Sequence, residues 1–180
     1  MWSKKEKLAL FAILLALAVF SRFIPHLWNA TFVNAGTLLV ASRLGFKKLV
    51  IVFPLLALFV SDLFLGFYNL AVLLVVYASF AFVGLIGIWL HSRRNSLSIA
   101  ILAAFFASTF FFISTNAAVW AFTDLYNSSL NGLLDSLLAG LPFYRNMLVF
   151  DILYTLSGFL AFDLLEKRVF KKRGAWNLSH

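Results

Sequence analysis

Long apolar segments alternate with short polar gaps along almost the whole chain. Each segment is close to the roughly 20 residues that a helix needs to cross a hydrocarbon core of about 30 Å. The pattern therefore predicts an all-α integral membrane protein, with residues 1–180 forming a single transmembrane domain. We expect six transmembrane helices, at about residues 8–24, 28–44, 49–66, 69–90, 97–115 and 147–165.

The second of these segments is the least hydrophobic. It carries Asn29, Thr31, Asn34 and Thr37. Lipid cannot satisfy the hydrogen-bonding groups of these side chains, so we expect this helix to pack inside the bundle. Pro25, just before it, is expected to mark the outer end of the first helix because proline interrupts helical hydrogen bonding.

The long gap at residues 121–146 has a helical pattern of its own. Its leucines recur at the i, i+3, i+4, i+7 spacing of an amphipathic helix. Residues 127–129 supply an N-cap, and residues 140–142 read Gly-Leu-Pro, which is a stop signal. We therefore expect a separate outer interfacial helix over residues 130–141. This helix either packs on the surface or acts as a lid over a binding site. The leucines are Leu130, Leu133, Leu134, Leu137, Leu138 and Leu141.

The basic residues are distributed unevenly among the gaps. Of the fifteen Lys and Arg residues, thirteen lie in alternate gaps, and Arg22 and Arg145 lie in the others. Lysine and arginine accumulate on the cytoplasmic side of a membrane, so we expect both termini in the cytoplasm and an even number of crossings. Asp163 and Glu166, near the end of the chain, are expected to be solvated helix-end charges. The thirteen are Lys4, Lys5, Lys7, Arg43, Lys47, Lys48, Arg93, Arg94, Lys167, Arg168, Lys171, Lys172 and Arg173.

The composition favours a membrane rather than a nucleic-acid partner. The chain is 63% hydrophobic and 12% charged, outside the range of an ordinary soluble domain. Juxtamembrane cations facing anionic lipid explain the formal net charge of +8. The sequence has no cysteine, and it shows no hydrolase, zinc-protease or phosphate-binding motif. We expect no enzymatic activity, no cofactor and no bound metal.

Most of the non-basic polar side chains fall in the outer third of the predicted bundle. Ionisable and polar groups at this depth are costly unless they are paired or functional. We expect them to line a substrate cavity with a mostly apolar wall of Phe residues. The expected lining residues are Asn29, Asn34, Asp62, Tyr68, Asn116, Trp120 and Asp151, with Arg22 and His26 at the rim.

Several of these residues also have simpler interpretations. Arg22 can pair with Asp62 or Asp151 and hold helix ends together, and such a pair can still line a cavity. Trp120 can be an interfacial anchor or can stack on a flat ligand. A metal site would need His26 with one of the carboxylates and further donors, and a loop histidine more often forms ordinary hydrogen bonds.

Small residues follow one face of the first predicted helix. They are Ala9, Ala12 and Ala16, and the last two have the small-x-x-x-small spacing that allows close approach of another helix. Packing within the bundle is the ordinary explanation of such a face. Docking of another membrane subunit is the alternative.

Four short motifs carry a resemblance to a known group of proteins. They read PHLWNAT at residues 25–31, SDLFLGFY at 61–68, TNAAVW at 115–120 and LPF at 141–143. In these motifs and their order, the sequence resembles an uncharacterised family of small prokaryotic membrane proteins. That family looks like the substrate-binding S components of energy-coupling factor (ECF) vitamin transporters, by size, six helices and layout.

The resemblance implies a binding protein of the prokaryotic cell (inner) membrane without catalytic activity. S components capture a vitamin or related micronutrient and dock onto a transmembrane coupling subunit that carries two ATPases. The face formed by Ala9, Ala12 and Ala16 matches the small-residue surface used for that docking. Two other functions stay open: a structural or accessory membrane subunit without a small-molecule site, and an intramembrane enzyme that uses Asp62, Asp151 and His26.

Overall fold

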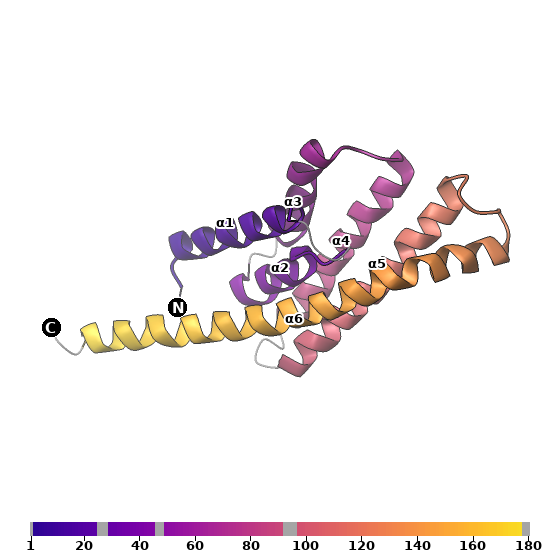
Figure 1. Cartoon of the computed structure of the whole chain (residues 1–180). Helices are drawn as coiled ribbons and strands as arrows, with labels where there is room; N and C mark the ends of the chain where they lie inside the picture. Colours follow the sequence, from indigo (N-terminus) through magenta and orange to yellow (C-terminus); the bar gives the residue numbers. More distant parts are fainter. Residues whose placement is uncertain (1, 25–28, 46–48, 92–96, 178–180) are drawn as a thin grey trace.

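Six helices make up the part of the chain that the structure describes (Figure 1). The computed structural model describes residues 2–24, 29–45, 49–91 and 97–177, and the side chains of these residues as far as 169. The described residues contain no strand, so the prediction of an all-α protein is confirmed. The helices are α1 (Lys4–Ser21), α2 (Val33–Leu39) with its continuation as the π-helix η1 (Val40–Leu44), α3 (Leu49–Leu65), α4 (Leu70–His91), α5 (Leu97–Phe122) and α6 (Leu130–Asn177).

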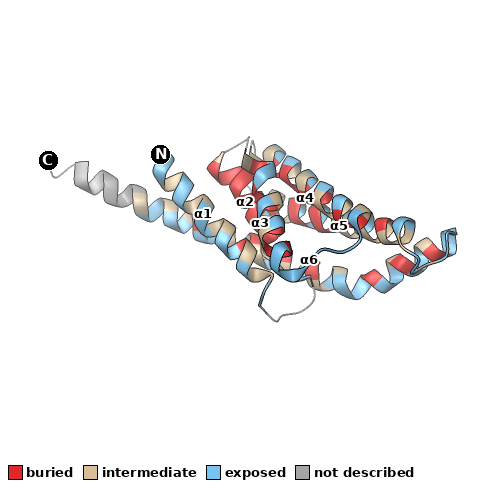
Figure 2. Ribbon diagram, turned by 90° about the horizontal axis from the view of Figure 1, so that it is seen from above, coloured by how far each residue is buried: buried red, intermediate tan, exposed pale blue. Residues whose placement is uncertain are grey.

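The short helix α2 and its continuation η1 occupy the centre of the bundle. Every residue from Val33 to Leu44 is buried, and α2 contacts each of the other five helices. Figure 2 shows the buried residues concentrated on α2 and within the group formed by α3, α4 and α5. The expectation that this polar segment packs inside the bundle is confirmed for Val33–Leu44, whereas Asn29 is exposed. The helix begins at Val33 rather than at the expected residue 28, so it is shorter than predicted. Trp28 itself lies outside the described residues.

Two neighbouring helices hold the C-terminal end of η1 through its backbone carbonyls. The ammonium group of Lys7 in α1 donates to the carbonyl oxygen of Leu44 at 2.9 Å. The Nδ1 atom of His91 in α4 lies 2.6 Å from the carbonyl oxygen of Ser42. Carbonyl groups at a helix C-terminus lack intrahelical partners, so these contacts satisfy groups that would otherwise be costly to bury.

Arg43 of η1 joins the central helix to α6. Its Nη2 atom lies 3.1 Å from Oδ1 of Asp163, and its guanidinium carbon lies 4.9 Å from the centre of the Phe159 ring. The Arg43 side chain is 5% exposed and that of Asp163 is 42% exposed. The expectation that Asp163 is only a solvated helix-end charge is therefore corrected. Its partner lies 120 positions earlier in the chain, a separation at which sequence spacing gives no signal.

The start of α1 is fixed by a capping box. The Oγ atom of Ser3 accepts a hydrogen bond from the backbone nitrogen of Glu6, and the backbone nitrogen of Ser3 donates to Oε2 of Glu6. The two bonds satisfy amide groups that a helix N-terminus leaves free. The helix therefore begins at Lys4, before the expected residue 8, and ends at Ser21. Pro25, expected to mark this end, lies outside the described residues.

The helices α5 and α6 form a long hairpin (Figure 1). The α6 helix is continuous over 48 residues, whereas the sequence predicts two helices at residues 130–141 and 147–165. The N-cap is as predicted, because the hydroxyl of Ser129 accepts a hydrogen bond from the backbone nitrogen of Gly132 at 3.2 Å. The predicted stop at residues 140–142 is corrected. The segment 130–141 forms the first turns of a helix that packs along α5 rather than a separate lid.

The glycine in the predicted stop signal has a packing role. Gly140 does not adopt the positive φ that a helix-terminating glycine uses, as Gly45 does after η1 with φ of 69°. A Cβ atom on Gly140 would collide with the side chain of Asn116 in α5, so its absence allows the two helices to approach closely. Pro142 lies inside α6, where its missing N–H removes one intrahelical hydrogen bond without ending the helix.

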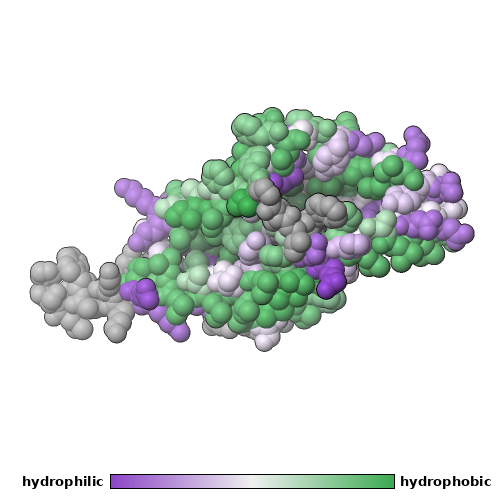
Figure 3. Space-filling model, viewed as in Figure 1, coloured by the Kyte–Doolittle hydropathy of each residue, from purple (hydrophilic) through white to green (hydrophobic). Residues whose placement is uncertain are grey.

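Among the described residues, three helices are long and apolar enough to cross a membrane, which indicates a membrane protein. They are α4, α5 and the part of α6 from Leu130 to Val169, and the shorter α3 is also apolar. Figure 3 shows a face of the molecule on which hydrophobic residues prevail, with hydrophilic ones more frequent towards its two ends. The start of α1 and the end of α6 lie at the same end of the molecule (Figure 1).

The close contact between α4 and the central helix yields the first prediction. A Cβ atom on Gly87 would collide with the Cβ of Ala41 in η1, so Gly87→Val should force the two helices apart. Overpacking of this kind costs about 1–3 kcal/mol. The apparent melting temperature in detergent should fall clearly below that of Ala78→Val, a control at an exposed site of the same helix. Equal melting temperatures for the two variants would contradict this packing.

Candidate functional site

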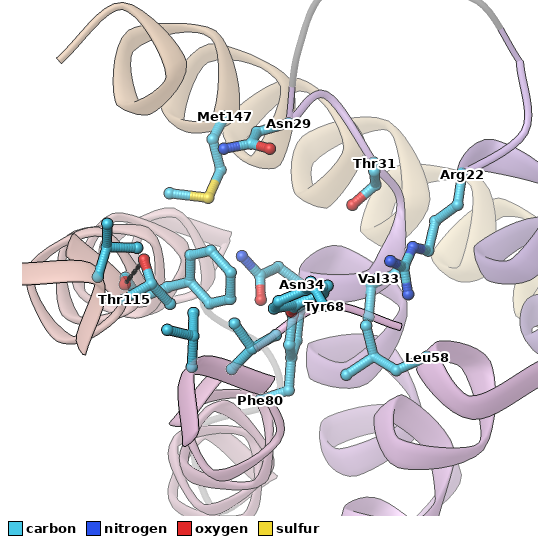
Figure 4. A pocket seen from close by; sticks show the side chains of 14 residues that line it. Arg22, Asn29, Thr31, Val33, Asn34, Leu58, Tyr68, Phe80, Thr115 and Met147 are labelled. Carbon is cyan, nitrogen blue, oxygen red and sulfur yellow. Dashed lines mark hydrogen bonds between the residues drawn. The ribbon is translucent and has the colours of Figure 1, made fainter. Parts of the chain in front are cut away.

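A cavity of about 290 Å³ lies where α1 and α3 end, and all six helices or the segments next to them contribute to its wall. Figure 4 shows Arg22 and Thr31 on one side of the hollow and Thr115 on the other. Asn29 and Tyr68 are exposed, so the cavity reaches the surface beside them. The lining residues are Arg22, Asn29, Thr31, Val33, Asn34, Leu58, Tyr68, Val72, Val76, Phe80, Phe111, Thr115, Val119 and Met147.

Four of the nine residues that the sequence predicts for the site line this cavity: Arg22, Asn29, Asn34 and Tyr68. The two predicted carboxylates lie behind its wall. Each of them holds one polar lining residue, Arg22 in one case and Asn34 in the other. They therefore act on the cavity through the residues that they orient.

The carboxylate of Asp62 joins three helices. Its Oδ1 atom lies 2.7 Å from Nη2 of Arg22, the residue that caps the C-terminus of α1. Its Oδ2 atom accepts a hydrogen bond from the hydroxyl of Tyr77 in α4 at 2.9 Å. The side chain of Asp62 is 2% exposed and that of Arg22 is 18% exposed. Of the two pairings open to Arg22 from sequence, the structure has the one with Asp62.

The carboxylate of Asp151 holds the amide of Asn34. Its Oδ2 atom accepts a hydrogen bond from Nδ2 of Asn34 at 2.6 Å and lies 2.7 Å from the hydroxyl of Ser108. Both Asp151 and Asn34 are almost fully buried, at 2% and 3% exposure. The interaction connects the central helix α2 with α5 and α6, and it fixes which end of the Asn34 amide faces the carboxylate.

Two polar atoms of lining residues have no hydrogen-bond partner among the described residues. They are Nη1 of Arg22 and Oδ1 of Asn34, and both atoms are buried. Buried polar groups in folded proteins are nearly always paired, and an exception calls for an explanation such as a ligand or bound water. One donor and one acceptor of residues that line the cavity are therefore without a partner among the described residues.

The rim residues Asn29 and Tyr68 lie in the segments between helices. Asn29 adopts a left-handed backbone conformation with φ of 62°, which asparagine tolerates better than most residues. Burial, followed by the negative charge of Asp62, raises the pKa of the Tyr68 phenol above its ordinary value of 10, while the Arg22 guanidinium lowers it. The phenol is therefore neutral at physiological pH and can donate a hydrogen bond.

Two of the predicted residues lie elsewhere. The side-chain Nδ2 of Asn116 donates to the backbone carbonyl of Phe112, and the backbone carbonyl of Asn116 accepts from the hydroxyl of Ser136 in α6. The indole nitrogen of Trp120 donates to the carbonyl of Asn127 at 3.0 Å. These two residues therefore stabilise the end of the α5–α6 hairpin next to its connecting loop. His26 lies outside the described residues.

Sequence reasoning missed the neighbours of these two residues, Thr115 and Val119, which line the cavity. Successive helical residues are turned by about 100° from each other. Because Thr115 and Val119 are four residues apart, they share one face of α5, and Asn116 and Trp120 share the next face. The four-residue spacing of Thr115 and Val119 is the signal that could identify the cavity face of α5. Selection by side-chain polarity instead favours the face with Asn116 and Trp120, which turns toward α6.

Ala9, Ala12 and Ala16 are exposed on α1. They are not part of the buried core of the described structure, to which α1 contributes Ala18. The described residues contain no group of three His, Cys, Asp or Glu side chains placed to hold a metal ion.

The second prediction concerns the buried ion pair. Asp62→Asn keeps the shape of the side chain but leaves the Arg22 guanidinium without a countercharge. Removing one partner of a buried pair costs about 3–5 kcal/mol, so the variant should unfold at a much lower temperature than the wild type. The control is Asp124→Asn, which neutralises an exposed carboxylate and should change stability by less than about 0.5 kcal/mol. Similar melting curves for both variants would show that the pair is not structural.

Comparison with known proteins gives a family but no function. No curated protein and no solved structure matches the chain. One family matches residues 3–173, which is nearly the whole sequence. The chain belongs to this family, a family of unknown function (DUF6580).

Proposed function

We propose that this protein is a membrane-embedded substrate-binding subunit that captures a small, vitamin-like micronutrient for uptake, in the manner of an S component. The observation that carries the proposal is the cavity formed by all six helices. Its volume of about 290 Å³ is near the lower end of the range for small-molecule sites. Its wall combines apolar side chains with a few polar groups, which is the usual composition of such a site.

The polar groups of the cavity are held in place before any ligand arrives. Arg22 is oriented by Asp62, and Asn34 is oriented by Asp151. Fixing a binding group in advance removes part of the entropic cost of association. The two buried carboxylates thus support binding without contacting the ligand.

The length of α6 supports a position across the membrane. Between Leu130 and Lys167 the helix is about 55 Å long at ~1.5 Å per residue, well beyond a hydrocarbon core of ~30 Å. Its basic C-terminal end lies at the same end of the molecule as the basic start of α1 (Figure 1). In our proposal this end is cytoplasmic in a prokaryotic cell membrane, and the cavity opens on the outer side.

Uptake through this subunit needs an energy source from another protein. The chain contains no phosphate-binding motif, so the proposal includes a transmembrane coupling subunit with ATPases as partner. The face of Ala9, Ala12 and Ala16 is exposed, and small residues on an exposed helix face allow another membrane helix to approach closely. We propose this face as the docking surface.

A structural or accessory subunit is the second candidate. The observation that favours it is that Asp62 uses both of its carboxylate oxygens within the protein, one for Arg22 and one for Tyr77. For such an arrangement, stabilising the packing of α1, α3 and α4 is a sufficient role without any ligand. The two candidates differ in whether the cavity next to this cluster is occupied by a small molecule.

The third prediction tests the orientation in the membrane. Because the natural chain has no cysteine, single cysteines can be introduced as Ser128→Cys and Lys167→Cys. A membrane-impermeant thiol reagent should label the first variant in intact cells and the second only after permeabilisation. Labelling of both sites from the same side would contradict the proposed topology.

The fourth prediction tests the binding function. Val119→Trp places a large side chain in the cavity, whereas Ala121→Trp adds the same side chain at an exposed site of the same helix. Native mass spectrometry of gently purified protein should show a bound small molecule in the wild type and in Ala121→Trp but not in Val119→Trp. A wild type without a bound molecule, or equal occupancy in both variants, would favour the structural role.

A further inference from the structure

The free polar atoms of the cavity restrict the chemistry of its ligand, and this inference rests on the proposed binding function. Nη1 of Arg22 is a donor, because a guanidinium group has no acceptor. It is buried and has no partner among the described residues. The ligand must therefore present an acceptor, such as a carbonyl oxygen, to the Arg22 side of the cavity.

The amide of Asn34 is oriented by its neighbour in α6. Oδ2 of Asp151 accepts from this amide at 2.6 Å, so the NH₂ group of Asn34 faces the carboxylate. The carbonyl oxygen of Asn34 is then the free end, and it too is buried without a partner among the described residues. An amide oxygen is only an acceptor. The ligand must therefore also carry an N–H or O–H donor.

The hydrogen-bonding groups and the Arg22–Asp62 pair favour an uncharged ligand. The positive charge of Arg22 is already matched by Asp62 at 2.7 Å, and the Asp62 side chain is 2% exposed. A ligand carboxylate would add a second negative charge to a pair that is already neutral, and burying an uncompensated charge is costly. A ligand ammonium group would face the guanidinium and would offer no acceptor to it.

The size and the walls of the cavity set the remaining limits. Its volume of about 290 Å³ equals that of about ten water molecules at ~30 Å³ each, so the ligand has about ten or slightly more non-hydrogen atoms. The rings of Phe80 and Phe111 line it with their centres 4.9 Å apart. Aromatic rings pack well against another ring in offset or tilted arrangements.

We infer that the ligand is a small uncharged ring compound with a carboxamide-like group, which gives an acceptor to Arg22 and a donor to Asn34. Carboxylates built on the same ring offer no donor to Asn34, and amines offer no acceptor to Arg22. The ring lies against Phe80 and Phe111.

The experiment compares compounds that differ only in this group. Two matched sets are titrated against the purified full-length protein, with binding read from the melting temperature: nicotinamide, nicotinate and 3-picolylamine, and benzamide, benzoate and benzylamine. At least one carboxamide should raise the melting temperature in a saturable way, and its carboxylate and amine counterparts should not. Stabilisation by the carboxylates or amines to the same extent, or by none of the carboxamides, overturns the inference.

A pair of matched variants tests the role of Arg22. Arg22→Lys keeps a positive charge for Asp62 but removes the forked guanidinium with its second donor. Loss of a hydrogen bond from a charged group should weaken carboxamide binding roughly ten- to hundredfold. Arg145→Lys is the control, since Arg145 is exposed on α6 and outside the cavity wall. Unchanged affinity in Arg22→Lys would overturn the assignment of this donor.

The inference and the proposed function fail in different ways. A charged small molecule found with the wild-type protein but not with Val119→Trp would overturn the carboxamide assignment and leave the binding function intact. A phospholipid released from the cavity would do the same to the assignment, because it carries a charged head group. Absence of any bound molecule, together with no stabilisation by any compound, would overturn both.

Discussion

The structure depends on the burial of a helix that carries polar side chains. All residues of α2 and η1 are buried, so their hydrogen-bonding groups are largely removed from lipid and bulk water. An unsatisfied buried polar group is costly, so the surrounding helices must supply partners. Thr37 bonds to a carbonyl of its own helix, Arg43 pairs with Asp163, and Asn34 pairs with Asp151. Contact with all five other helices follows from this requirement.

The cavity lies where this requirement is met only in part. At the C-terminal end of η1, side chains from α1, α4 and α6 contact its polar groups. At the other end, Asp151 satisfies one half of the Asn34 amide and Asp62 satisfies one half of the Arg22 guanidinium. The unpaired atoms are Nη1 of Arg22 and Oδ1 of Asn34, and both belong to residues that line the cavity. The same two carboxylates that join the helices therefore orient the donor and the acceptor that a ligand would bind.

Apolar segments and one polar segment are sufficient to predict an all-α bundle with the polar segment inside, because both follow from local composition. The length of α6 was not predictable, since Gly140 resembles a helix stop unless its contact with Asn116 of α5 is known. The α5 part of the cavity was assigned one residue off, to Asn116 rather than Thr115. Polarity indicates how far along the helix a site residue lies. Neighbouring residues point about 100° apart, and packing with distant segments determines which of them faces the cavity.

The most direct test of the account is an experimental structure of gently purified protein in lipid at a resolution that shows individual side chains. The account predicts non-protein density in the cavity, within hydrogen-bond distance of Nη1 of Arg22 and Oδ1 of Asn34, and against the rings of Phe80 and Phe111. A cavity that has closed, with both of these atoms bonded to other protein groups, would contradict it.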